Sequence, residues 1–157
     1  MSTDTPEAND IYSQRLLALA DNLDRTERLP DPDATAWVRS RLCGSEVTVD
    51  LKMDGEVVSD FAHEVKACKL GTASAAVMAR HVVGSAAGEL RELRQTMRAM
   101  LKDNGPPPTG RWVDLEVLAP ARKIRSRHPS IMLTFDAVTR AIDEIESRRD
   151  TPAPSGR

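Results

Sequence analysis

Two cysteines have the greatest capacity for chemistry in this sequence. Cys43 follows an expected strand, and Cys68 lies between an expected strand end and an expected helix start, flanked by Lys66 and Lys69. A thiol at a helix N-terminus lies at the positive end of the helix dipole, which favours the thiolate, and the two lysines act in the same direction. Two thiolates side by side suit metal binding or persulfide chemistry.

The residues alone leave the role of these thiols open. Free cysteine is among the most buried residue types, so each thiol could belong to the core, and the spacing is far from a CxxC pair. Among the histidines, His63 lies in an expected strand and is predicted to be a partly buried structural residue. His128 follows a basic run and precedes Pro129, and it is a candidate for a place near the site. The sequence has no GxSxG, no HExxH and no phosphate-binding glycine loop.

The elements that would position the cysteines begin with an alternating pattern. Apolar and polar residues alternate over 47–53, which predicts a strand with one buried face. Asp54-Gly55 follows and is typical of a two-residue type I′ hairpin turn. Residues 56–66 are predicted to form the return strand and 37–42 a third strand beside them. The three strands would form an antiparallel meander that brings both cysteine loops to one end of the sheet.

The rest of the chain is predicted to be helical. Apolar residues recur at helical spacing over 11–23, from Ala73 to near Gly84, over 90–101 and over 115–124, and Thr134 is a candidate cap for a final helix that contains Phe135. The fold class is therefore predicted to be α+β, a three-stranded antiparallel meander packed by about five helices. Composition divides the chain into a disordered tail at 1–10, one domain at 11–149 and a second tail at 150–157.

Composition argues against several function classes. The 157 residues are 40% hydrophobic and 29% charged, with a net charge of −2, which argues against a nucleic-acid partner. The densest basic run, Arg122 to Arg127, favours a solvated face over a docking patch. The first ten residues do not resemble a signal peptide, and no stretch approaches the ~20 apolar residues that span a bilayer, so a cytoplasmic location with no membrane partner is expected.

Around the two cysteines the sequence resembles the NifU/IscU/SufU family of iron–sulfur cluster assembly scaffolds. That family has Cys-Gly-Asp after its first strands, and here the motif is Cys43-Gly44-Ser45. It then has a hairpin and a Cys-x-[Ile/Leu]-[Ser/Gly]-x-Ala-Ser-[Ala/Ser] motif that opens a helix, and here Cys68 to Ala75 matches it. The resemblance runs from about Ile11 to Ile145, implies a SufE/NifU-like fold, and is nearest to the SufU branch.

The chain departs from the family pattern at two ligand positions. The aspartate after Cys-Gly is replaced by Ser45. The family's third cysteine lies in an Arg-x-x-Cys segment at the start of the last helix, and here that segment ends at Ser130. The resemblance therefore implies Cys43 and Cys68 as ligands, with Ser45 and Ser130 at degenerate ligand positions.

The resemblance also implies a function and partners. Such a scaffold accepts sulfur from a cysteine desulfurase, binds iron or a [2Fe-2S] cluster, and transfers it to apo iron–sulfur proteins; Cys68 would be the persulfide acceptor. A cluster and tetrahedral zinc each want four ligands, and the two cysteines supply two. A second copy of the chain in a homodimer, His128 or a small thiol could supply the others. The favoured hypothesis is a non-enzymatic scaffold; the alternatives are a SufU-like zinc-dependent sulfurtransferase and a degenerate accessory subunit.

Overall fold

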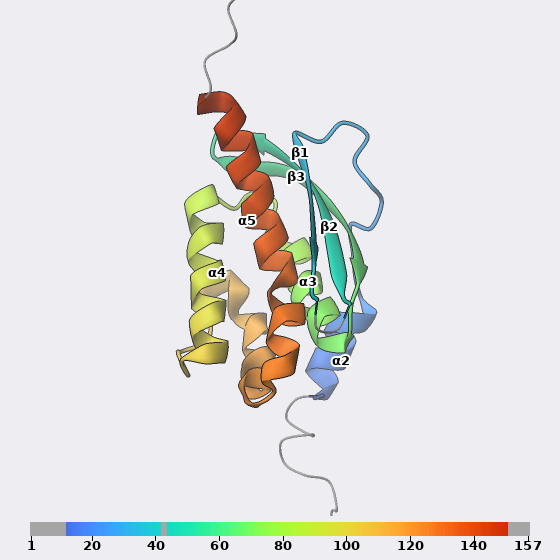
Figure 1. Cartoon of the computed structure of the whole chain (residues 1–157), viewed down its shortest axis with the longest axis vertical. Helices are drawn as coiled ribbons and strands as arrows, with labels where there is room; N and C mark the ends of the chain where they lie inside the picture. Colours follow the sequence, from blue (N-terminus) through green and yellow to red (C-terminus); the bar gives the residue numbers. More distant parts are fainter. Residues whose placement is uncertain (1–11, 42–43, 151–157) are drawn as a thin grey trace, which may run out of the picture.

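The predicted α+β fold is confirmed by the computed structural model, which describes residues 12–41 and 44–150 (Figure 1). The predicted tail at 1–10, residues 151–157 of the second tail and Cys43 lie outside the described residues. In chain order the elements are α2 (Gln14–Asp21), β1 (Ala34–Arg39), β2 (Glu46–Asp54), β3 (Val57–Lys66), α3 (Lys69–His81), α4 (Ala87–Lys102), the 3₁₀ segments η1 (Gly110–Lys123) and η2 (Arg125–Arg127), and α5 (His128–Asp150).

The sheet is the predicted antiparallel meander, in the order β1-β2-β3. Its central strand follows the alternation seen in the sequence, because Val47, Val49, Leu51 and Met53 are all buried on one face. Strand β2 pairs with β1 from Glu46 opposite Arg39 and with β3 from Glu46 opposite Lys66. The ends of β1 and β3 therefore lie at the same end of the sheet, where the two cysteine loops begin.

Two predicted boundaries in the sheet are wrong, and so is the predicted turn type. The first strand covers 34–39 rather than 37–42. The hairpin turn is formed by Gly55-Glu56 rather than Asp54-Gly55, since Asp54 still pairs with Val57. Of the two turn residues only Gly55 has positive φ (64°), which fits a type II′ turn with glycine first and not type I′.

The final helix also begins earlier than predicted. Helix α5 begins at His128, so Thr134 does not cap it but lies buried in its interior. Pro129 is compatible with this start because the first turn of a helix leaves its N–H groups unpaired in any case.

The helices cover one face of the sheet, and a single hydrophobic core lies between them and the sheet (Figure 1). Helix α5 crosses β1 and β2, α3 packs beside it, α4 and η1 pack on the outside, and α2 packs on α3. On the opposite face, Asp50 is fully buried because the loop before β1 covers it; Arg28 donates to it at 2.6 and 2.9 Å and the Leu29 N–H at 3.0 Å. Burial alone would raise the pKa of Asp50, but these bonds and one from Thr35 outweigh it and hold that pKa below its usual value.

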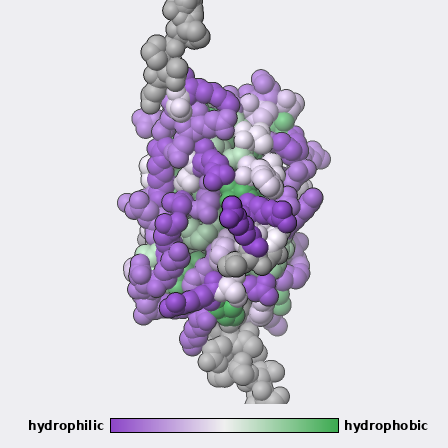
Figure 2. All heavy atoms as spheres, viewed as in Figure 1, coloured by the Kyte–Doolittle hydropathy of each residue, from purple (hydrophilic) through white to green (hydrophobic). Residues whose placement is uncertain are grey.

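The surface of the molecule on the α5 side is mostly hydrophilic, and its apolar atoms form small scattered patches (Figure 2). In the part of the chain that the structure describes, no helix is both long and apolar enough to cross a membrane.

Candidate functional site

Cys68 occupies the position that the sequence predicted, at the start of a helix. Strand β3 ends at Lys66 and α3 begins at Lys69, so Cys68 is the N-cap residue, with extended backbone (φ −67°, ψ 172°). Its carbonyl accepts the first helical hydrogen bond, from the Thr72 N–H at 2.9 Å. Its side chain makes no capping bond to the helix and is partly exposed, so the thiol is available for other contacts.

The contacts of this thiol join three segments that are far apart in the sequence. The Cys68 Sγ lies 3.4 Å from the Ser130 Oγ, and the Ser130 hydroxyl donates to the Ser45 Oγ at 3.2 Å. Ser45 precedes β2 and Ser130 lies in the first turn of α5; both serines are buried. The structure thus brings together Cys68 and the two serines that the resemblance placed at degenerate ligand positions. We call these three side chains the Cys–Ser–Ser row.

Close packing between α3 and α5 holds the row together. A Cβ on Gly71 would lie 2.5 Å from the Ser130 Oγ and 2.9 Å from the Ser130 carbonyl oxygen, so only glycine allows this approach. One turn further, the buried Ser74 hydroxyl donates to the Ile131 carbonyl at 2.9 Å. Both residues belong to the motif that runs from Cys68 to Ala75, but no local pattern in the sequence indicates that they pack against α5.

The loop that contains Cys43 is closed by backbone hydrogen bonds. The Ser40 N–H donates to the Ser45 carbonyl at 2.8 Å, and the Gly44 N–H donates to the Ser40 carbonyl at 2.9 Å. Gly44 has φ of 73°, a conformation that glycine adopts without strain. Cys43 itself lies outside the described residues, so its pairing with Cys68 stays a prediction.

Within the described part of the chain, His128 makes no hydrogen bond to the Cys–Ser–Ser row. Its Nε2 lies 3.1 Å from the Ala121 carbonyl and 3.2 Å from the Arg122 carbonyl, which makes Nε2 a donor. Its ring lines a groove between α4 and α5 instead. Within residues 12–41 and 44–150 no three His, Cys, Asp or Glu side chains form a group able to hold a metal ion.

The lysines beside Cys68 differ in their surroundings. Lys69 Nζ lies 3.3 Å from an Asp21 carboxylate oxygen, and both side chains are exposed, so the charge of Lys69 is partly compensated. Lys66 is exposed at the end of β3. Cys68, as the N-cap residue, lies at the positive end of the α3 dipole.

Comparison with proteins of known structure gives a strong match. The chain is 54% identical to a nitrogen-fixing NifU-like protein (N-terminal) from Brucella abortus, with a TM-score of 0.89 over 90% of this chain and 99% of that one. It also has the fold of a putative iron–sulfur cluster assembly scaffold protein for the SUF system from Fervidobacterium islandicum AW-1, at 18% identity and a TM-score of 0.78 over 86% of this chain and 98% of that one.

Two curated proteins are similar in sequence. The iron–sulfur cluster assembly scaffold protein IscU of Thermotoga maritima is 22% identical over 135 residues, 86% of this chain and 94% of that protein. The protein of the same name from Streptococcus pyogenes serotype M1 is 26% identical over 100 residues, 64% of this chain and 63% of that protein. No family model matches the chain.

Proposed function

Because the chain belongs to the NifU/IscU/SufU family of iron–sulfur cluster assembly scaffolds, we propose that it is a scaffold that accepts sulfur from a cysteine desulfurase and holds iron or a [2Fe-2S] cluster for transfer to apo-proteins. One observation carries the proposal. The thiol of Cys68, at the N-terminus of α3, lies within hydrogen-bond distance of the Ser130 hydroxyl, which in turn donates to the Ser45 Oγ; the resemblance places both serines at ligand positions of the family.

Sulfur acceptance requires a single thiolate, which Cys68 supplies. Its sulfur attacks the terminal sulfur of the persulfide on the desulfurase cysteine; the new S–S bond forms on Cys68 as the old one breaks, and the desulfurase cysteine leaves as a thiolate. While Cys68 is a thiol, it donates a hydrogen bond to the Ser130 Oγ, because the Ser130 hydroxyl donates its own hydrogen bond to the Ser45 Oγ. Once Cys68 is a thiolate, the Ser130 hydroxyl can rotate and donate a hydrogen bond to the sulfur. A hydrogen bond to an ion is about twice as strong as one between neutral groups.

Cluster binding demands more ligands than one chain provides. Cys43 and Cys68 supply two of the four that a [2Fe-2S] cargo wants, and the serine hydroxyls at the other two positions are poor ligands for iron. His128 would have to break its contacts with two backbone carbonyls to contribute Nε2. Two cysteines from a second copy of the chain complete the set without such a cost, so we propose a cluster shared between two chains.

Zinc follows the same ligand count. Tetrahedral structural zinc takes four Cys, His or carboxylate ligands from protein. The described residues offer one thiol at the row, and Cys43 would add a second, so the residues present do not fit a resident zinc held by one chain.

Anaerobic reconstitution with iron and sulfide tests the cluster. We expect a visible charge-transfer spectrum at one cluster per two chains, lost in Cys43→Ser and in Cys68→Ser. Ser130→Cys places a third thiol beside Cys68 and should raise the amount of bound cluster, whereas Ser130→Ala is the matched variant that adds no ligand. A spectrum that survives Cys68→Ser would refute the assignment of this ligand.

Persulfide transfer is measured separately. The protein is incubated with a cysteine desulfurase and cysteine, and intact mass reports the gain of one sulfur atom. We expect Cys43→Ser to retain the gain and Cys68→Ser to lose it. Sulfur uptake without any cluster, together with stoichiometric zinc, would favour the sulfurtransferase; absence of sulfur, cluster and zinc would favour the accessory subunit.

A further inference from the structure

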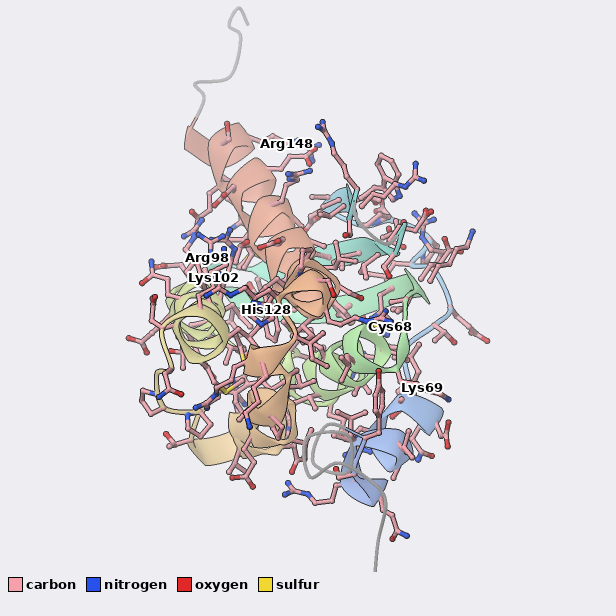
Figure 3. All side chains as sticks on the ribbon, turned by 60° about the horizontal axis from the view of Figure 1, so that its bottom comes forward. Cys68, Lys69, Arg98, Lys102, His128 and Arg148 are labelled. Carbon is pink, nitrogen blue, oxygen red and sulfur yellow. The ribbon has the colours of Figure 1, made fainter. Side chains whose placement is uncertain are left out.

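A groove separate from the Cys–Ser–Ser row lies between the C-terminal part of α4 and the first turns of α5. Its volume is about 550 Å³. Figure 3 shows Arg98 and Lys102 of α4 facing the start of α5 at His128, with Cys68 on the other side of that segment. The lining residues are Arg98, Lys102, Arg125, His128, Pro129, Met132 and Asp136.

Three basic side chains converge on this groove without counter-ions. The side chains of Arg98, Lys102 and Arg125 make no ion pair or hydrogen bond with any residue that the structure describes. The acidic lining residue, Asp136, already accepts a bond from Arg94 Nε at 2.6 Å, so its charge is compensated from outside the groove. The lining therefore carries an excess of positive charge.

Local helix electrostatics do not account for this arrangement. Lys102 in the last turn of α4 compensates the negative end of that helix dipole. Arg98, however, lies one turn before Lys102, and like charges at this spacing destabilise a helix. Arg125 lies just before the N-terminus of α5, the end of a helix at which a cation is unfavourable. A bound anion would relieve both repulsions.

We propose that this groove binds a small ligand with two or more anionic groups, either phosphates or carboxylates. Its volume falls within the range of about 300–1,000 Å³ typical of small-molecule sites. Arg98 and Lys102 are separated by one helical turn, about 6 Å along the axis, which suits two anionic groups on one ligand. Met132 and Pro129 supply the apolar part of the lining. The proposal does not depend on the proposed scaffold function.

Only part of the basic run from Arg122 to Arg127, which was predicted to be a solvated face, lines the groove. Arg122 is held by bonds to the Ala119 carbonyl and the Asn104 side chain. Lys123 is exposed and does not line the groove, whereas Arg125 does. Lys123 therefore provides a matched control, since its loss changes the net charge by the same amount without changing the groove.

The experiment titrates the whole protein with pyrophosphate and with citrate at low ionic strength, by isothermal titration calorimetry. We expect one site per chain for at least one of the two anions. Arg125→Gln and Arg98→Gln should each weaken binding about tenfold, the effect of losing one charge-assisted hydrogen bond. Lys123→Gln should change it less than about twofold. Methyl NMR places the site, because the Met132 signal should shift on titration and the Met53 signal, from the sheet, should not.

The outcomes separate the sources of the anion. Binding of pyrophosphate alone assigns a phosphate ligand, and binding of citrate alone a carboxylate ligand. Equal weakening by Lys123→Gln and Arg125→Gln would refute the site, because diffuse attraction would then explain the binding. Failure of both anions to bind, with binding of a polyglutamate peptide instead, would also overturn the proposal and assign the groove to a protein partner.

Discussion

Replacing Gly71 with alanine is the sharpest test of the packing that forms the Cys–Ser–Ser row. The added Cβ would lie 2.5 Å from the Ser130 Oγ and 2.9 Å from its carbonyl oxygen, both closer than real Cβ contacts. The hydroxyl can rotate away, but the carbonyl belongs to the backbone of α5. The two helices must therefore separate, and Ser130 must move away from Cys68.

The expected change in the free energy of unfolding follows from a comparison of two glycines. Gly88 occupies the first turn of α4, as Gly71 occupies the first turn of α3, and a Cβ on Gly88 meets nothing within 4 Å. Gly88→Ala should raise the free energy of unfolding by about 0.4–1 kcal/mol, through the lower entropy of the unfolded chain. That gain is common to both variants, so the difference between them isolates the cost of overpacking, about 1–3 kcal/mol.

Urea denaturation at constant m-value measures this difference. We expect Gly71→Ala to unfold at lower urea than the parent and Gly88→Ala at higher urea. The double variant Gly71→Ala/Ser130→Ala removes the 2.5 Å contact but keeps the 2.9 Å one, and it should recover only part of the loss. In a Cys43→Ser background, the rate of Cys68 alkylation should also change in Gly71→Ala and not in Gly88→Ala. Equal stabilisation by both alanines would refute the close approach of α3 and α5.

Three further predictions concern buried polar groups. Burial, together with the charge of Arg25, lowers the pKa of His63, so the unfolded chain binds a proton at this residue more readily than the folded chain. The free energy of unfolding should therefore be highest above pH 6.5 and decrease as the pH falls below it. Urea denaturation at a series of pH values should show a smaller decrease in His63→Gln. Asp50→Asn should lower the free energy of unfolding, measured by urea denaturation, by about 1.5–3 kcal/mol. The neutral amide of asparagine would accept a weaker hydrogen bond from Arg28 than the buried carboxylate does, and the partly exposed Arg28 would lose its ion pair with residue 50. The hydroxyl of Thr134 is buried and has no hydrogen-bond partner among the residues that the structure describes, so Thr134→Val should stabilise the protein by about 1 kcal/mol on thermal unfolding. A loss of stability would show that this hydroxyl is bonded.

The sequence predicted those parts of the fold in which local pattern and tertiary packing agree. The alternation from Val47 to Met53 placed the central strand because every second side chain enters the core. The position of Cys68 at a helix start was equally accessible, since β-branched residues before it give way to a small-residue helix. The start of β1 at Ala34 was not, because alanine gives little hydrophobic contrast although Ala34 and Ala36 are both buried.

The site could be predicted only in part, for a physical reason. Ser45, Cys68 and Ser130 meet because α5 returns across the sheet, and no local pattern encodes a contact over 62 or 85 residues. The family resemblance gave the two serine positions, and the structure supplied the contacts between them. The groove between α4 and α5 gave no sequence signal, since Arg98 and Arg125 each resemble an ordinary solvated residue until the fold brings them together.

Serine at two ligand positions separates two capacities that cysteine would join. A hydroxyl keeps the hydrogen bond to Cys68 and can stabilise its thiolate, which is what sulfur acceptance requires. The same hydroxyl binds iron poorly, so under the proposed function the remaining cluster ligands would come from beyond one chain. Ser130→Cys should therefore increase cluster binding without increasing the rate of persulfide formation on Cys68. If both rise together, the row acts as a single metal-binding unit and the hydrogen-bonding role assigned to Ser130 is wrong.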